Sequence, residues 1–198
     1  MAAMSVMITK CERCGTPVPP HDTVHYGDLS KYETLCTACF NRAVAERMGI
    51  AVDEAKFEPV TVPDCDGRPH VLHVRRRLCG TGQVVEAFEL IGDAPGGYQF
   101  GILGELDGDP MELFAQLYER MRRGLAQKHL VDDEHGTHLV FPGPVRGHIS
   151  SDYGCDPEPL PVVVIDGREF TWEEFGRMLL SFEGWQFRLE IIDRTDEA

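Results

Sequence analysis

Cys11-Glu12-Arg13-Cys14 and Cys36-Thr37-Ala38-Cys39 are the stretches that decide the fold of the N-terminal part of this chain. In each stretch two residues separate two cysteines, a spacing that lets both thiolates reach one metal ion from a tight turn. Two such pairs supply the four sulfur ligands of a closed tetrahedral zinc site. We therefore predict one structural zinc ion per chain, bound by Cys11, Cys14, Cys36 and Cys39. Redox chemistry at one pair is the rival interpretation, and the second matching pair favours metal.

The residues around the two pairs predict a hairpin and a helix. We expect strands at 24–28 and 31–35, followed by a helix at 36–48 that ends at Gly49. A turn with one cysteine pair, a hairpin, and a helix whose first turn carries the second pair resemble the treble-clef zinc finger. The resemblance covers residues 1–50. It implies a metal site that stabilises the fold and leaves no position open for water.

Composition and charge restrict the classes of function. The chain has 198 residues, of which 42% are hydrophobic and 26% charged, a balance typical of globular proteins. The net charge of −14 is uneven, because residues 1–50 carry five basic and five acidic groups, whereas residues 131–198 carry five and fifteen. An acidic surface repels phosphate backbones, so we expect no binding of duplex nucleic acid outside the finger.

Nothing in the sequence indicates a membrane segment. We find no run of about 18 apolar residues, and the first residues lack the basic flank and long apolar run of a secretion signal. Paired cysteines in such a chain indicate metal binding in the reducing cytoplasm. The remaining Cys65, Cys79 and Cys155 are expected to be reduced and buried.

Residues 51–131 predict a strand meander followed by a helix. Strands are expected at 57–62, 71–74, 84–91 and 98–103, separated by glycine-rich turns. Asp109-Pro110 predicts a helix start, with an N-cap acid and proline at the first helical position. Apolar residues then recur at helical spacing, at Met111, Phe114, Leu117, Tyr118, Met121 and Leu125.

Residues 145–198 predict a strand–helix–strand unit with a polar tail, after a loop-like stretch at 131–159. Val162–Ile165 is expected to be a buried strand, and Thr171–Glu174 a capping box that begins a helix. Alternating apolar side chains from Trp185 to Ile191 are typical of a half-buried strand. We predict that Phe175 and Trp185 belong to the core. The chain is thus expected to be an α+β protein of three parts, at 1–50, 51–131 and 145–198.

Several histidines and arginines are candidate functional groups. His135, His138, His148 and Asp152 can form an open metal site, although solvated loop histidines are the simpler interpretation. His70 and His73 are expected to point to opposite sides of a strand, so they do not easily share a metal. A second zinc site of these two with Cys65 and Cys79 has irregular spacing and is treated as coincidence. The run Arg75-Arg76-Arg77 is interpreted as a salt-bridged, solvated strand edge rather than an anion site.

An HNH-type nuclease is the sharpest enzymatic alternative, since that family also builds on a treble clef. The four cysteines resemble its structural part, and Asn41 after the last pair resembles the Cys-Asn of that family. His21-Asp22 or His25 can be offered as the base. The expected Asp-His or His-His pair and an asparagine in the hairpin are absent. Beyond the finger, the chain resembles uncharacterised bacterial proteins that carry such a finger. We therefore expect a cytoplasmic, non-enzymatic zinc-binding adaptor or regulator whose partner is another protein.

Overall fold

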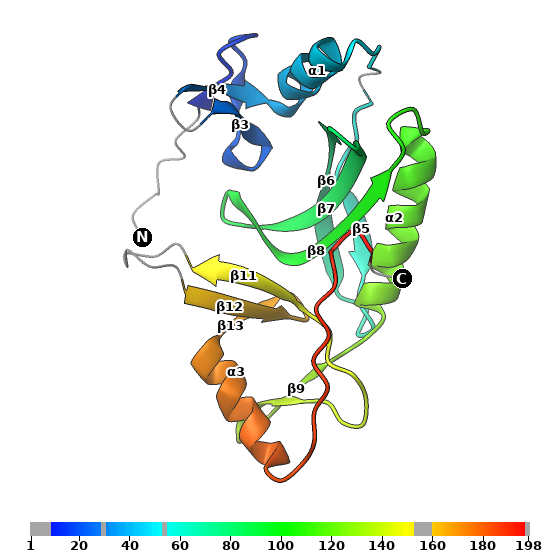
Figure 1. The fold of residues 1–198 in the computed structure, drawn as a ribbon. Helices are drawn as coiled ribbons and strands as arrows, with labels where there is room; N and C mark the ends of the chain where they lie inside the picture. Colours follow the sequence, from blue (N-terminus) through cyan, green and yellow to red (C-terminus); the bar gives the residue numbers. More distant parts are fainter. Residues whose placement is uncertain (1–8, 29–30, 53–54, 153–159, 197–198) are drawn as a thin grey trace.

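The computed structural model describes residues 9–28, 31–52, 55–152 and 160–196. Within these residues every ladder between strands is antiparallel, and three α-helices accompany the strands. The predicted α+β class is therefore confirmed. Figure 1 shows three groups of elements along the long axis of the molecule, with the longest strands in the middle group.

The first group, which we call the finger, contains two small hairpins and a helix. Its elements are β1 (Thr9–Lys10), β2 (Pro17–Val18), η1 (Pro20–Asp22), β3 (Thr23–Asp28), β4 (Lys31–Cys36) and α1 (Thr37–Met48). The predicted hairpin and helix are both present. Gly49 ends α1 with a left-handed φ of 69°, a conformation that glycine adopts without a Cβ clash. The finger has only a small core, centred on Val18, Leu35 and the cysteines.

The second group is a four-stranded sheet with one helix. Its elements are β5 (Val60–Pro63), β6 (Pro69–Cys79), β7 (Gly82–Ile91), β8 (Ala94–Gly104) and α2 (Pro110–Leu125). The strands lie in chain order, because short turns join antiparallel neighbours. Helix α2 begins as predicted, since the Asp109 carboxylate accepts a hydrogen bond from the amide of Met111 at 2.8 Å.

Helix α2 covers one face of this central sheet, and the main core lies between them (Figure 1). The buried residues of α2 are Leu113, Leu117, Met121 and Leu125. The predicted apolar stripe is therefore wrong at Met111, which is exposed. Met111 lies in the first turn of α2, and Leu113 takes the inward position there.

The third group contains a hairpin, a three-stranded sheet and a helix. Its elements are β9 (Leu130–Asp133), β10 (Gly136–Leu139), β11 (His148–Asp152), β12 (Leu160–Ile165), β13 (Arg168–Thr171), α3 (Trp172–Leu179) and η2 (Leu180–Phe182). The capping box at Thr171 and Glu174 is present and begins α3 as predicted. A separate core packs Leu130, Ile165, Phe170 and other residues against α3.

Two predictions for this third group are wrong. The stretch 131–159 is not simply a loop, because β10, β11 and most of β9 lie in it. The strand predicted from Trp185 to Ile191 is not formed, and the side chain of Trp185 is 61% exposed rather than part of the core. An alternating pattern makes a strand only where a neighbouring strand supplies hydrogen bonds, and the described residues offer none here.

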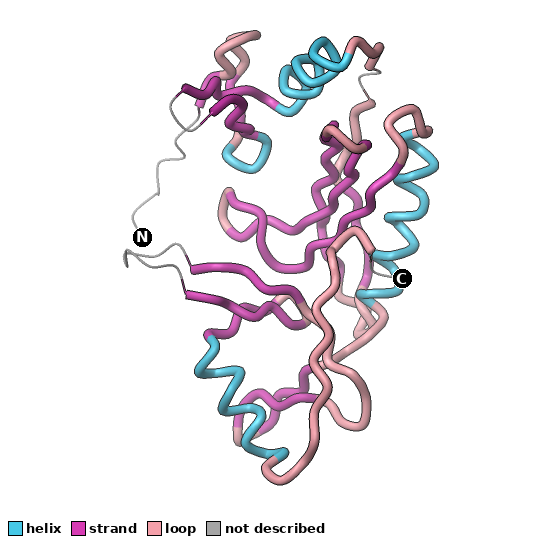
Figure 2. The backbone as a smooth tube through the Cα atoms, in the orientation of Figure 1, coloured by secondary structure: helices cyan, strands magenta, loops and turns pink. Residues whose placement is uncertain are grey.

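The face of the central sheet opposite α2 receives parts of both other groups. Val85 and Ala87 on β7 point toward α2, so Glu86 and Phe88 point to the opposite face. The finger packs over this face near β6, and the tail beyond η2 ascends to it as an extended loop (Figure 2). Three distant parts of the chain therefore meet on one side of this sheet.

Candidate metal centre

The four predicted cysteines come together in the finger. Their sulfur atoms all lie within 4.8 Å of one another, and the Sγ atoms of Cys14 and Cys36 are 3.9 Å apart. Four sulfurs at about 2.3 Å from a zinc ion at the centre of a tetrahedron are about 3.8 Å from each other. The arrangement is thus close to the spacing that a tetrahedral metal ion requires.

The first pair lies in the turn between β1 and β2. Gly15 closes this turn with a φ of 71° and donates a hydrogen bond to the carbonyl of Cys11 at 2.8 Å. The turn is joined to β4, because Glu12 donates its amide to the carbonyl of Thr34 at 2.9 Å and accepts the amide of Thr34 at 3.1 Å. These contacts hold the first pair beside the second.

The second pair lies where β4 ends and α1 begins. Cys36 is the N-cap of α1, and its sulfur accepts a hydrogen bond from the amide of Cys39 at 3.5 Å. The unpaired amides of a helix N-terminus favour negative charge, which stabilises a thiolate at this position. The sequence places two ligands on one helical turn and aims both toward the first pair.

The four thiols differ in acidity. Burial raises the pKa of Cys36 and that of Cys39, the latter to about 12. Burial also disfavours the Cys11 thiolate, but backbone hydrogen bonds, the strongest from Cys14, outweigh it and lower the pKa of Cys11 to about 6. Hydrogen bonds from Thr16 lower the pKa of Cys14. A divalent cation between the sulfurs favours the thiolate form and so offsets the cost of burying it.

Asn41, two residues after the last cysteine, links the finger to the central sheet. Its side-chain nitrogen donates to the carbonyl of Arg76 at 2.9 Å, and its oxygen accepts the amide of Leu78 at 2.8 Å. The pairing of β5 with β6 ends at Leu72, so this edge of β6 is open at residues 76–78. The Asn41 amide thus supplies the donor and the acceptor that a neighbouring strand would supply.

A buried carboxylate lies on the same face of the sheet. Glu86 is 3% exposed. One of its oxygens accepts from Arg75 at 2.9 Å, and the other accepts from Arg77 at 2.9 Å and from Arg194 at 2.5 Å. Burial raises the pKa of Glu86, but Arg77, Arg75 and Arg194 together hold it below its usual range. Arg75 and Arg77 are therefore salt-bridged, as predicted. The prediction of a solvated edge is wrong for Arg75 and Arg76, which are both largely buried.

Arg75 also joins this cluster to the finger. Its guanidinium donates to the carbonyl of His21 and lies 5.0 Å from the centre of the Phe88 ring. The ring of His21 lies 5.2 Å from that of His73. Burial, together with His21, lowers the pKa of His73. No local pattern indicates the contacts of His21 with Arg75 and His73, since these partners are more than 50 residues apart.

The structure separates the residues considered for a nuclease site. Asn41 is bound to the backbone of β6, and His25 packs against the ring of Tyr32 at 4.8 Å. His21 faces the sheet through its contact with Phe88. Within the described residues, the four cysteines are the one group of three or more side chains that is arranged to hold a metal ion.

Among the side chains that the structure describes, the other candidate ligands are also not gathered. His135 lies exposed in the turn before β10, His138 contacts Asp133 at 3.1 Å, and His148 lies on β11. The side chain of Asp152 and all of Cys155 lie outside the described residues. His70 hydrogen-bonds Glu89 at 2.8 Å, away from His73.

The prediction that the extra cysteines are buried is wrong for Cys65, which is exposed, and Cys79 is half-buried. Cys65 lies in the turn between β5 and β6, and Cys79 lies at the end of β6. Neither position is covered by the sheet core.

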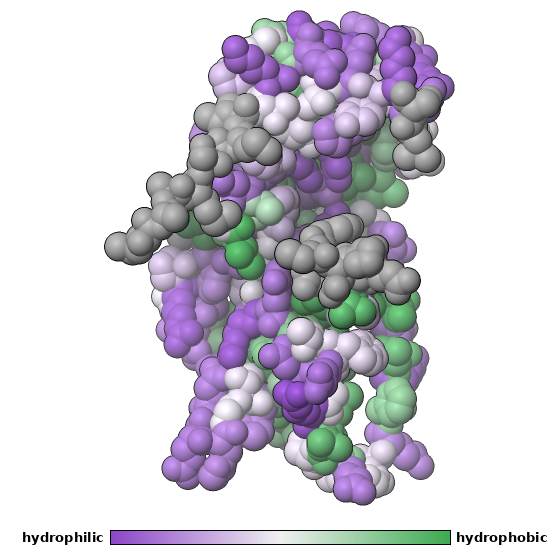
Figure 3. Space-filling view, turned by 90° about the vertical axis from the view of Figure 1, so that its left-hand side faces the viewer, coloured by the Kyte–Doolittle hydropathy of each residue, from purple (hydrophilic) through white to green (hydrophobic). Residues whose placement is uncertain are grey.

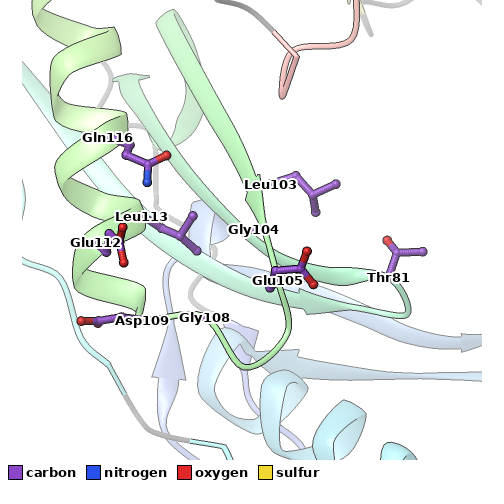
Figure 4. Close-up of a pocket in the computed structure, with 9 residues that line it drawn as sticks. All are labelled: Thr81, Leu103, Gly104, Glu105, Gly108, Asp109, Glu112, Leu113 and Gln116. Atoms are coloured by element: carbon purple, nitrogen blue, oxygen red, sulfur yellow. The ribbon is translucent and has the colours of Figure 1, made fainter.

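Two pockets lie near the residues described above. One of about 370 Å³ lies between the finger and the sheet, where His21, Asn41 and Arg75 form part of its wall. The other, of about 440 Å³, lies beside the start of α2. Figure 4 shows its carboxylates coming from α2 and from the loop after β8. Asp109 among them is already used as the helix cap.

Three family models match successive segments of the chain. A domain of unknown function (DUF7685) matches residues 10–51, a second (DUF7686) residues 53–126, and a third (DUF7713) residues 129–196. The first of these segments holds all four clustered cysteines. No curated protein and no solved structure matches the chain.

None of the described helices is long and apolar enough to cross a lipid bilayer.

Proposed function

We propose that Cys11, Cys14, Cys36 and Cys39 bind one zinc ion in a finger of the treble-clef type. The observation that carries this proposal is the cluster of four sulfurs within 4.8 Å, with one pair on a turn and one at a helix start. Four thiolates fill the coordination of zinc and leave no position for a substrate. The metal therefore acts by holding the finger folded, since its binding energy is also folding energy.

We further propose that the protein is a non-enzymatic adaptor or regulator in the cytoplasm. The finger supports this role because Asn41 fixes it to the central sheet, so the metal stabilises the surface that both share. The residues offered for a nuclease make structural contacts instead. A reducing compartment suits the unpaired thiols.

The partner proposed here is another protein. Residues 131–198 carry a net charge of −10, and large apolar side chains are exposed on the same part of the chain. Figure 3 shows such apolar residues on the lower half of one face, among polar ones. Exposed apolar surface with a polar rim is typical of protein interaction sites, and the charge disfavours duplex nucleic acid.

Metal counting tests the first proposal. Native mass spectrometry of the full chain should find a single zinc ion, and Cys39→Ser should lose it. Hydrogen exchange should then rise across β3, β4 and α1, while β7 and β8 stay protected. Cys65→Ser is the matched control, because Cys65 is exposed outside the cluster and should leave the metal bound. Disulfides among the four cysteines, or a second tightly bound metal, would contradict the proposal.

An activity assay tests the second proposal. The zinc-loaded chain is incubated with plasmid DNA and added Mg²⁺ or Mn²⁺, and we expect no cleavage above that of the Cys39→Ser variant. Cleavage that is lost in His25→Ala, while the zinc stays bound, would instead establish the nuclease.

A further inference from the structure

The segment 185–193, which we call the arm, is an extended chain without a partner strand. The arm follows η2 and pairs with no strand among the described residues. Among its backbone amides, the one of Trp185 donates a hydrogen bond to a described backbone carbonyl, that of Phe182 at 3.0 Å. Figures 1 and 2 show the arm as a long tube that rises from α3 toward α2. A segment of this shape presents its backbone groups for pairing with another strand.

The side chains of the arm are exposed although many are apolar. Phe187 is 91% exposed, Leu189 72% and Ile191 73%. Leaving side chains of this size in water forgoes about 1.5–3 kcal/mol each relative to full burial. Contiguous exposure of this kind marks an interaction site rather than an ordinary surface.

Both ends of the arm are fixed to the body of the protein. At one end the ring of Trp185 lies 4.9 Å from that of Phe141 and 6.1 Å from that of Phe182. Just beyond the other end, Arg194 contacts Glu86, and Arg120 donates to the carbonyl of Thr195 at 2.9 Å. The arm is therefore held in an extended form before any partner binds, which lowers the entropy cost of pairing.

We propose that the arm pairs with the same arm of a second copy of this chain, as an antiparallel ribbon with its two-fold axis at Leu189. In this register Phe187 of each copy faces Ile191 of the other, and Arg188 faces Glu190. The sequence is thus self-complementary in both shape and charge, as an interface with two-fold symmetry requires. Arg188 and Glu190 can make these pairs, because both side chains are exposed. In the described part of one chain they form an ion pair with each other, at 3.5 Å.

The available apolar area also suits a dimer. Two aromatic side chains in each arm carry roughly 300–500 Å² of surface, and stable interfaces remove about 800 Å² from each partner. Leu189, Ile191 and the exposed Phe141 next to Trp185 can supply the remainder. The two-fold register uses both arms completely, so the assembly closes at two copies instead of growing into a filament.

Sedimentation of the full chain over a range of concentrations at physiological salt tests the proposal. The wild type should change from monomer to dimer, and Leu189→Arg, which sets two arginines together at the axis, should weaken the dimer at least about tenfold. Leu180→Arg makes the same change at an exposed residue outside the arm and should leave the dimer intact. Equal weakening by both variants would overturn the assignment to the arm.

A charge-exchange experiment tests the register. Arg188→Glu alone and Glu190→Arg alone each place like charges opposite one another, so each variant should be monomeric at concentrations where the wild type is dimeric. Mixing the two variants should restore a dimer containing one copy of each. In that dimer the two introduced side chains face each other with opposite charge, and so do the two native ones that remain. A mixture that stays monomeric would overturn the register.

A wild type that stays monomeric at every concentration would overturn the proposal as a whole. The arm would in that case serve a different protein.

Discussion

Removing the Asn41 amide should weaken the attachment of the finger to the central sheet. In Asn41→Ala the carbonyl of Arg76 and the amide of Leu78 lose their partners. A buried backbone group left without a partner costs about 1–3 kcal/mol. Water reaches this half-buried edge in part, so we expect a total loss of about 2–3 kcal/mol.

For a chain of this length each kcal/mol corresponds to a shift of about 2–4 °C in melting temperature, so the shift should be about 4–12 °C. Thermal unfolding of the zinc-loaded chain measures it. Hydrogen exchange at the Leu78 amide should accelerate by at least about tenfold, since each 1.4 kcal/mol is a factor of ten.

Two variants control the interpretation. Glu46→Ala changes an exposed residue on the same helix, whose nearest partner Arg13 is 3.7 Å away, and should cost under about 0.5 kcal/mol. Asn41→Asp retains the acceptor for Leu78 but sets a carboxylate against the carbonyl of Arg76, so it should be no more stable than Asn41→Ala. If Asn41→Ala melts like Glu46→Ala and leaves exchange at Leu78 unchanged, the amide does not hold the finger on the sheet.

Three further predictions concern stability. Glu86→Gln should lower the free energy of unfolding in urea by about 2–3 kcal/mol. This is less than the loss of about 3–5 kcal/mol typical of a broken buried ion pair, because Arg77 and Arg194 reach solvent. An unchanged urea midpoint would show that the Glu86 cluster does not stabilise the fold. Leu117→Ala should cost about 2–5 kcal/mol by leaving a cavity, whereas Trp185→Ala in dilute protein should cost under about 1 kcal/mol, and the reverse order would place Trp185 in the core. The lowered pKa of His73 favours the neutral imidazole in the folded state. The contribution of His73 to stability is therefore present above about pH 6.5 and is lost as pH falls through the pKa of the folded state. The urea midpoint should decrease between about pH 7 and pH 5, and this decrease should be smaller in His73→Gln.

Local signals predicted the elements whose cause is local. The two cysteine pairs indicated the metal cluster, the Asp109-Pro110 pair indicated the start of α2, and the box from Thr171 to Glu174 indicated the start of α3. In each case the interacting groups lie within a few residues of one another, or the ligand chemistry itself requires them to meet.

Contacts over long separations were not predictable in this way. Asn41 resembled the Cys-Asn of the nuclease family by its position after Cys39, whereas its partners on β6 are 35 and 37 residues away. The arm has the alternation of a strand, but a strand also needs a neighbour, and the pattern of one segment says nothing about its neighbours. The hairpin of β9 and β10 was missed because its strands are short and mostly polar.

The contact between Arg194 and Glu86 joins residues that are 108 positions apart. At synthesis rates of about 5–20 residues per second, residue 194 is made roughly 5–20 s after residue 86. The hairpin of β6 and β7, which brings Arg75 and Arg77 to Glu86, forms far faster than that. During synthesis the Glu86 carboxylate is therefore bound first by Arg75 and Arg77, and Arg194 binds it only after that residue has been made. A chain truncated before Arg194 would leave Glu86 with Arg75 and Arg77 as its arginine partners.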